Sequence, residues 1–197
     1  MSRSGLAEPR SLPPGQRLTP VLRTVQYGRV PRIALATWSL RIGGDTLDGE
    51  ALSLSWADLA SLPRTVVRAD HHCVSRNTTL DLLWSGVAAR TIVEMAPPAD
   101  DVAHVLVSAA RVYSTNIRLE DLSSSRAVFA THLDGEPLSP EHGWPLRLVL
   151  PHLYGWKGPK WVVTIDYQRY VERGFWEQRG YHLTGDVWRE ERYSYQE

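Results

Sequence analysis

The sequence of 197 residues has almost no cysteine, since Cys73 is the only one. A single thiol excludes an intramolecular disulfide and any zinc site built on two or more thiolates. The chain also lacks a run of about 18 apolar residues, which a membrane-spanning helix needs, and its N-terminus has no apolar stretch typical of a signal peptide. We therefore expect a cytoplasmic protein with no membrane partner, in which Cys73 needs an explanation of its own.

A net charge is absent as well, because 22 basic residues balance 22 acidic ones. Nucleic acids and anionic membrane surfaces select basic proteins, so this balance argues against nucleic acid as a partner. Lysine is scarce too, and the only two, Lys157 and Lys160, both lie in the segment 154–161. Either chance placed them together, or the segment gathers cations for a ligand.

The pattern of apolar residues predicts one β-rich domain of the α+β class. Residues 1–17 are rich in Ser, Pro, Gly and Arg, which favours a flexible N-terminal arm before a domain of residues 18–197. Alternating or continuous apolar runs predict short strands at 37–42, 65–69, 103–108, 127–132, 146–150 and 161–167. Capping residues and prolines predict short helices at 55–62 and 88–96. Strands and helices do not alternate regularly, which argues against a doubly wound fold.

Cys73 follows the predicted strand at 65–69 and two histidines, and it precedes the polar residues 75–79. A loop at the rim of a sheet is a frequent place for a functional group. Three interpretations stay open: a small buried hydrophobe, a nucleophilic thiolate paired with a histidine, or a ligand to a soft metal held mainly by a cofactor. Since side chains alternate along a strand, only His71 would share the face of Cys73.

A second polar cluster covers residues 136–160, with His142 beside a glycine and Arg147 inside an apolar strand. An arginine among leucine and valine is costly to bury alone, so Arg147 needs either an acidic side chain or a phosphate as its partner. Glycine N–H groups and three cations, Arg147, Lys157 and Lys160, together favour phosphate binding.

These segments together resemble the sulfite-oxidase-like molybdopterin-binding oxidoreductase family, in particular its small cytoplasmic members that lack haem and dimerisation domains. The resemblance covers the chain from about residue 12 to the C-terminus. Its motifs, in chain order, are YGRVP at 27–31, HCVS at 72–75, YSTNI at 113–117, EHGWPLR at 141–147, YGWKGPKW at 154–161, GFWE at 174–177 and GYH at 180–182. It implies a sulfite-oxidase-type domain that binds one molybdenum-molybdopterin cofactor, a single pyranopterin.

The resemblance also implies a set of site residues. Cys73 matches the molybdenum ligand, and Tyr113 matches the active-site tyrosine beside the metal. The residues implied to contact the cofactor are Gln26, Tyr27, His72, His142, Arg147, Gly158, Pro159 and Lys160.

Two departures from the family bear on the substrate. Val25 and Thr78 occupy positions where sulfite oxidases carry arginines for their dianionic substrate, and Asn77 replaces a tryptophan that many relatives have. Sulfite is therefore not the expected substrate, although Arg76 offers a charge at a different spacing.

The implied activity is two-electron oxygen-atom transfer on a small oxyanion, S-oxide or N-oxide. The chain has no haem, flavin or iron–sulfur motif, so we expect electrons to pass through a separate protein partner. The alternative is a protein that carries or stores the molybdenum cofactor without turnover, which the missing arginines favour.

Overall fold

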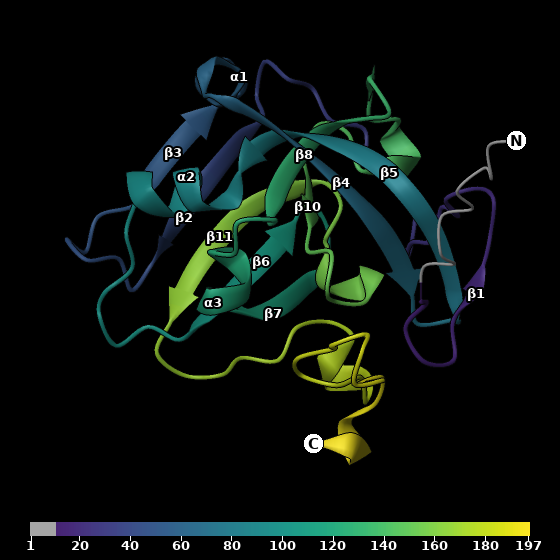
Figure 1. Cartoon of the computed structure of the whole chain (residues 1–197). Coiled ribbons are helices and arrows are strands. Elements are labelled where there is room, and N and C mark those ends of the chain that lie inside the picture. The colour runs from purple at the N-terminus through teal and green to yellow at the C-terminus, as the bar shows by residue number, and fades with distance from the viewer. Residues whose placement is uncertain (1–10) are drawn as a thin grey trace, which may run out of the picture.

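Two β-sheets form the body of the computed structural model, which describes residues 11–197 (Figure 1). The first sheet has the order β1-β5-β8-β10, with β4 paired to β5 and β9 to β8, and the second has the order β3-β2-β11-β6-β7. The strands are β1 (Arg17–Leu18), β2 (Ser39–Gly44), β3 (Leu52–Ser55), β4 (Arg64–Cys73), β5 (Asn77–Ala88), β6 (His104–Ala109), β7 (Ser114–Arg118), β8 (Val128–Leu133), β9 (Glu136–Pro137), β10 (Arg147–Val149) and β11 (Val162–Gln168). The α-helices are α1 (Trp56–Ser61), α2 (Ala89–Met95) and α3 (Leu119–Leu122). None of the helices within residues 11–197 combines the length and the apolar character needed to cross a membrane.

The predicted β-rich α+β class is confirmed, and each predicted strand and helix has a counterpart. Helix α1 begins after Ser55, whose hydroxyl accepts from the N–H of Asp58 while the Asp58 carboxylate accepts from the N–H of Ser55. The largest difference is β5, for which the sequence predicted no strand, because the residues that follow Cys73 were expected in a polar loop. Strands β1, β3, β7 and β9 and helix α3 were not predicted either. Thr78 and Thr79 are β-branched, so pairing with β4 over the whole hairpin extends a strand through them.

The main core lies between the two sheets. Leu40 and Ile42 of β2 and Ile165 of β11 pack in one cluster with Phe129 of β8 and Leu148 of β10. A second cluster, which includes Leu22, Val67, Ala69, Trp84 and Val149, joins the chain after β1 to β4, β5 and β10. The segment that follows β1 is thereby packed against the first sheet.

The first ten residues of the expected flexible arm lie outside the described residues, whereas residues 11–17 contact the domain. Arg17 of β1 pairs with Asn77 at the start of β5. Gln16 Nε2 donates to the carbonyl oxygen of Cys73 at 3.2 Å, and Gln16 Oε1 accepts from Thr78 Oγ1 at 3.1 Å. This end of the arm therefore supports the turn that follows Cys73.

A buried ion pair ties the C-terminal segment to the second sheet. Lys157 Nζ lies 2.7 Å from Glu177 Oε1, and the two side chains are 1% and 0% exposed. Glu177 Oε1 also accepts from Thr115 Oγ1 at 2.6 Å and from the N–H of Asn116 at 3.0 Å, while Lys157 Nζ donates to the carbonyl of Leu183 at 2.6 Å. The expectation that Lys157 serves a phosphate is therefore wrong, because partners inside the protein occupy its ammonium group.

Replacing Lys157 by methionine should lower the free energy of unfolding by about 3–5 kcal/mol, because the buried Glu177 carboxylate then loses its counter-charge. Urea denaturation measures this loss. The control is Arg41→Ala, which removes an exposed ion pair of 2.9 Å with Asp166 and should cost less than about 1 kcal/mol. Equal, small losses in both variants would contradict a structural role for Lys157.

Candidate active site

The β4–β5 hairpin places four polar side chains on one face. His71 is paired with Thr79, and Cys73 with Asn77. Directly paired residues of antiparallel strands point to the same face, and alternate residues along each strand do so as well. All four side chains accordingly line one cavity of about 390 Å³.

His72 lies on the opposite face of the hairpin, paired with Thr78. Its side chain is buried, with 4% of the residue exposed, and its Nδ1 lies 2.9 Å from Thr78 Oγ1. Burial lowers the pKa of His72, so the imidazole is neutral near pH 7. The structure thus corrects the predicted site: strand alternation turns His72 away from the cavity and brings its neighbour His71 into it.

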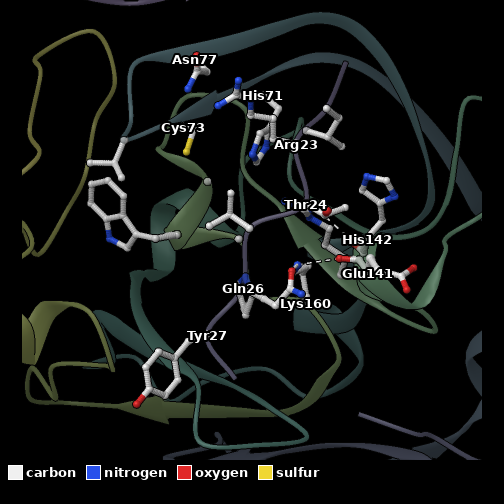
Figure 2. Close-up of a pocket in the computed structure, with 18 of the residues that line it drawn as sticks. Arg23, Thr24, Gln26, Tyr27, His71, Cys73, Asn77, Glu141, His142 and Lys160 are labelled. Atoms are coloured by element: carbon white, nitrogen blue, oxygen red, sulfur yellow. Dashed lines mark hydrogen bonds between the residues drawn. The ribbon is translucent and has the colours of Figure 1, made fainter. Parts of the chain in front are cut away.

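The other walls of the cavity come from distant parts of the chain. The segment 19–27, the turn around 141–147, the segment 155–161 and the C-terminal Trp176 and Tyr181 complete it. The predicted residues that line it are Cys73, Gln26, Tyr27, Tyr113, His142, Arg147, Gly158, Pro159 and Lys160. In Figure 2, Cys73 and His71 lie on one side of the cavity, and Lys160, Gln26 and Glu141 lie on the other.

Arg147 brings a buried positive charge to the cavity wall. It is 6% exposed, and no acidic side chain in residues 11–197 forms an ion pair with it. Its Nη1 donates to the carbonyl of His142 at 3.3 Å, and its guanidinium lies 5.2 Å from the ring centre of Trp84. Its Nε has no hydrogen-bond partner in the described part of the chain. Burial lowers the pKa of Arg147 to about 10, so the group remains charged at neutral pH. A bound anion would therefore neutralise the buried charge of Arg147 in the cavity wall.

Lys160 lies next to Arg147, because the two residues form an antiparallel bridge. Their close approach requires Gly143, where φ is 112° and a Cβ would lie 3.0 Å from the Cβ of Lys160 and 3.1 Å from that of Arg147. Burial and the charge of Arg147 lower the pKa of Lys160 to about 7. The same two causes lower the pKa of His142. An anion bound here would relieve the repulsion between these groups.

The family model of the oxidoreductase molybdopterin-binding domain matches residues 27–176. The chain belongs to this family. The oxidoreductase YuiH of Bacillus subtilis strain 168 is 37% identical over 185 residues, which cover 93% of this chain and 92% of YuiH. The resemblance seen in the sequence is thereby confirmed, and with it a molybdopterin-dependent oxidoreductase whose cofactor is molybdenum-molybdopterin.

More distant relatives are longer proteins. The protein-methionine-sulfoxide reductase catalytic subunit MsrP of Campylobacter jejuni is 24% identical over 71% of this chain and 52% of its own length. Human mitochondrial sulfite oxidase is 24% identical over 86% of this chain and 37% of its own length. The crystal structure of the sulfane dehydrogenase SoxCD from Paracoccus pantotrophus superposes with a TM-score of 0.63 at 21% identity, over 72% of this chain and 40% of that one. That likeness shows the fold, and this chain spans about half or less of these three proteins.

The cavity of this molybdopterin-binding domain fits the cofactor of its family. Arg147 Nε is a buried donor without a partner among residues 11–197, and the phosphate of molybdopterin is an acceptor that would satisfy it. Cys73 offers the soft thiolate that a molybdenum centre takes as a ligand. Arg147, Lys160 and His142 would hold the phosphate and Cys73 the metal.

Tyr113 lies in the wall of the same cavity, but its hydroxyl hydrogen is engaged by the carbonyl oxygen of Trp156. Burial and the nearby Glu177 raise the pKa of Tyr113 well above its usual value. The phenol therefore remains protonated at neutral pH. It contributes a fixed, neutral hydroxyl to the site.

Several residues that line the cavity were not predicted from the sequence. Arg23 lies in a segment without regular structure, so no periodicity marked it. Trp176 and Tyr181 belong to the C-terminal motifs of the resemblance, which pointed to the family but not to the site, and both line the cavity. Proximity in space, which sequence spacing does not reveal, is what links them to Cys73.

Sulfate, whose charge is constant at these pH values, should bind the cofactor-free protein about tenfold more weakly at pH 8 than at pH 6. Lys160, with a pKa of about 7, loses its proton between the two, and a bound anion favours the charged form. Isothermal titration calorimetry measures the affinity. In Lys160→Arg the charge persists, and the pH dependence should disappear. A dependence that survives in this variant would assign the titration to another group.

Proposed function

We propose that the protein transfers an oxygen atom, with two electrons, to or from a small S-oxo or N-oxo compound at a molybdenum centre held by Cys73. The observation that carries this proposal is the presence, in one cavity of a molybdopterin-binding domain, of the Cys73 thiol and of the Arg147 and Lys160 cations, which form no ion pair within residues 11–197. The cofactor supplies the redox chemistry when bound. The chain would hold the cofactor at two places, with Arg147 and Lys160 at its phosphate and Cys73 at its metal.

The anchoring end consists of Arg147, Lys160 and their neighbours. Lys160 Nζ donates to the carbonyl of Glu141 at 2.7 Å and to Gln26 Oε1 at 3.2 Å, which keeps the ammonium at the cavity edge (Figure 2). Gly158 and Pro159 continue the same wall, and a Cβ at Gly158 would lie 2.6 Å from the carbonyl oxygen of Leu148. This wall is rigid, so it can fix the cofactor in one position relative to Cys73.

Arg23 supplies a cation for the substrate on the side of Cys73. In Figure 2 it lies with His71, Cys73 and Asn77, away from Lys160. No acidic side chain within residues 11–197 forms an ion pair with it, so its guanidinium is available to a substrate oxygen. Thr78 faces away, Val25 is apolar, and burial lowers the pKa of His71 well below its usual value. One cation suits a neutral oxide or a monoanion better than a dianion.

The names of the distant relatives support a sulfur–oxygen substrate. One is a reductase of methionine sulfoxide in proteins and another an oxidase of sulfite. A sulfoxide needs only one donor to its oxygen, and Arg23 provides donors on that side of the cavity. We propose that electrons arrive from a separate protein, since no second redox motif accompanies Cys73 in the sequence.

Turnover with a reduced dye and a panel of sulfoxides, N-oxides and, in the opposite direction, sulfite tests the function. We expect oxide-dependent dye oxidation by protein that contains about one molybdenum per chain. In Cys73→Ser the pterin should remain, because its anchor lies elsewhere, while turnover is lost because a serine oxygen is a hard, poorer donor. Full molybdenum content without turnover on any substrate would favour the carrier or storage alternative.

Arg23→Met should raise the KM for the oxide substrate about tenfold or more while molybdenum content stays unchanged, because one charge-assisted hydrogen bond contributes roughly 1.5–3 kcal/mol. Steady-state kinetics together with metal analysis separate these effects. Arg23→Lys retains a charge and serves as the matched control, with a smaller rise. A Met variant that loses the cofactor instead would place Arg23 in cofactor binding.

A further inference from the structure

A chain of hydrogen bonds leads to the sulfur of Cys73. Ser75 Oγ donates to Cys73 Sγ over 3.1 Å. Asn77 Nδ2 donates to Ser75 Oγ over 2.9 Å, and Arg17 Nε donates to Asn77 Oδ1 over 3.2 Å. These three bonds, which we call the Arg17 relay, connect a guanidinium charge to the thiol that the metal takes as a ligand.

Arg17 determines which atom donates and which accepts in each hydrogen bond of the Arg17 relay. An arginine N–H can only donate, so the Asn77 side chain must present its oxygen to Arg17. The Asn77 amide nitrogen then faces Ser75, where it can only donate. Ser75 Oγ has used an acceptor position on this bond, and its own hydrogen is directed at Cys73 Sγ. The amide orientation is thereby fixed by the charge at its far end.

The backbone around the relay is supported from three parts of the chain. Arg17 is paired with Asn77 in the parallel β1–β5 ladder, and its N–H donates to the carbonyl of Arg76 at 3.0 Å. The N–H of Arg76 in turn donates to the carbonyl of Cys73 at 3.0 Å. From the C-terminal segment, Arg192 Nη1 donates to the carbonyl of Val74 at 2.5 Å. The turn that carries Ser75 is therefore held in one conformation.

We propose that the Arg17 relay positions the Ser75 hydroxyl to withdraw electron density from Cys73 Sγ and so weakens the sulfur as a donor to molybdenum. Hydrogen bonds in series polarise one another, and a charge at the start of the series strengthens the effect at its end. Partners of a metal ligand tune the metal in this way in other metal sites. The proposal rests on the proposed binding of molybdenum by Cys73 but not on the substrate class, so it stands whether or not that class is correct.

Removing the Ser75 hydroxyl, which donates to Cys73 Sγ, tests the proposal. In fully loaded Ser75→Ala, the sulfur-to-molybdenum charge-transfer absorption should move to longer wavelength and the molybdenum reduction potential should fall, because the sulfur becomes a stronger donor. Ser75→Thr keeps the hydroxyl and should match the unsubstituted protein in both measurements. Ser75 is exposed, so neither change should unfold the chain. Unshifted spectra in Ser75→Ala, or equal shifts in both variants, would overturn the proposal.

Reversing the hydrogen bond between Asn77 and Ser75 gives a second test. In Asn77→Asp the new carboxylate has no donor for Ser75 and accepts the Ser75 hydroxyl itself, so that hydrogen leaves the sulfur. The added charge also moves the absorption, and a double-mutant cycle separates the two effects. The shift that Ser75→Ala causes should vanish in the Asn77→Asp background, whereas additive shifts would count against the relay.

Arg17→Met completes the series, since it removes the charge but leaves Ser75 and Asn77 in place. The absorption should move in the same direction as in Ser75→Ala, by a smaller amount. Metal analysis accompanies each spectrum. If Ser75→Ala lost the cofactor while Ser75→Thr retained it, Ser75 would be a structural support of the site, and the electronic role would be rejected.

Discussion

The register of the β4–β5 hairpin is the constraint on which the cavity depends. Side chains alternate along each strand, so a slip of one residue would replace His71, Cys73, Asn77 and Thr79 by His72 and Thr78 on the cavity face. The turn fixes this register, because Arg76 adopts a φ of 67° and its N–H bonds to the carbonyl of Cys73. β1 then secures the hairpin end through its pairing with Asn77 and Thr78. The position of the Cys73 sulfur thus depends on the pairing of β1, β4 and β5 together.

The two lysines show how neighbouring cations acquire different roles. Lys157 lies inside the protein, where Glu177 neutralises it and carbonyl groups satisfy its donors. Lys160, three residues later, faces the cavity beside Arg147 and forms no ion pair with a carboxylate of the described residues 11–197. The first lysine stabilises the fold, whereas the second and Arg147 leave a positive charge for an anion to neutralise. Cofactor binding should accordingly add to the stability of the folded chain.

The segment before β2 belongs to the site as much as to the fold. Gln16 and Arg17 contact the Cys73 turn, and residues 19–27 form a wall of the cavity that includes Arg23. Asn77 joins this segment to Ser75 and the sulfur.

The sequence by itself determined the local structure and the chemical demands of single residues. Apolar spacing and capping at Ser55 located β2, β4, β6, β8, β10 and β11 and the helices α1 and α2 within a few positions, and the leucine-rich surroundings of Arg147 already required an anion. Tertiary structure decided which partners meet. Strand β5 was not predicted, because its first residues are polar and form a strand only beside β4. Alternation along the strand already indicated that His71 shares the face of Cys73, and only the packing of the hairpin shows that this face lines the cavity. Glu177 neutralises Lys157, and Arg23 reaches the cavity, only because segments distant in sequence pack together. Local sequence patterns indicate which kind of partner a side chain requires, and long-range packing decides which group provides that partner.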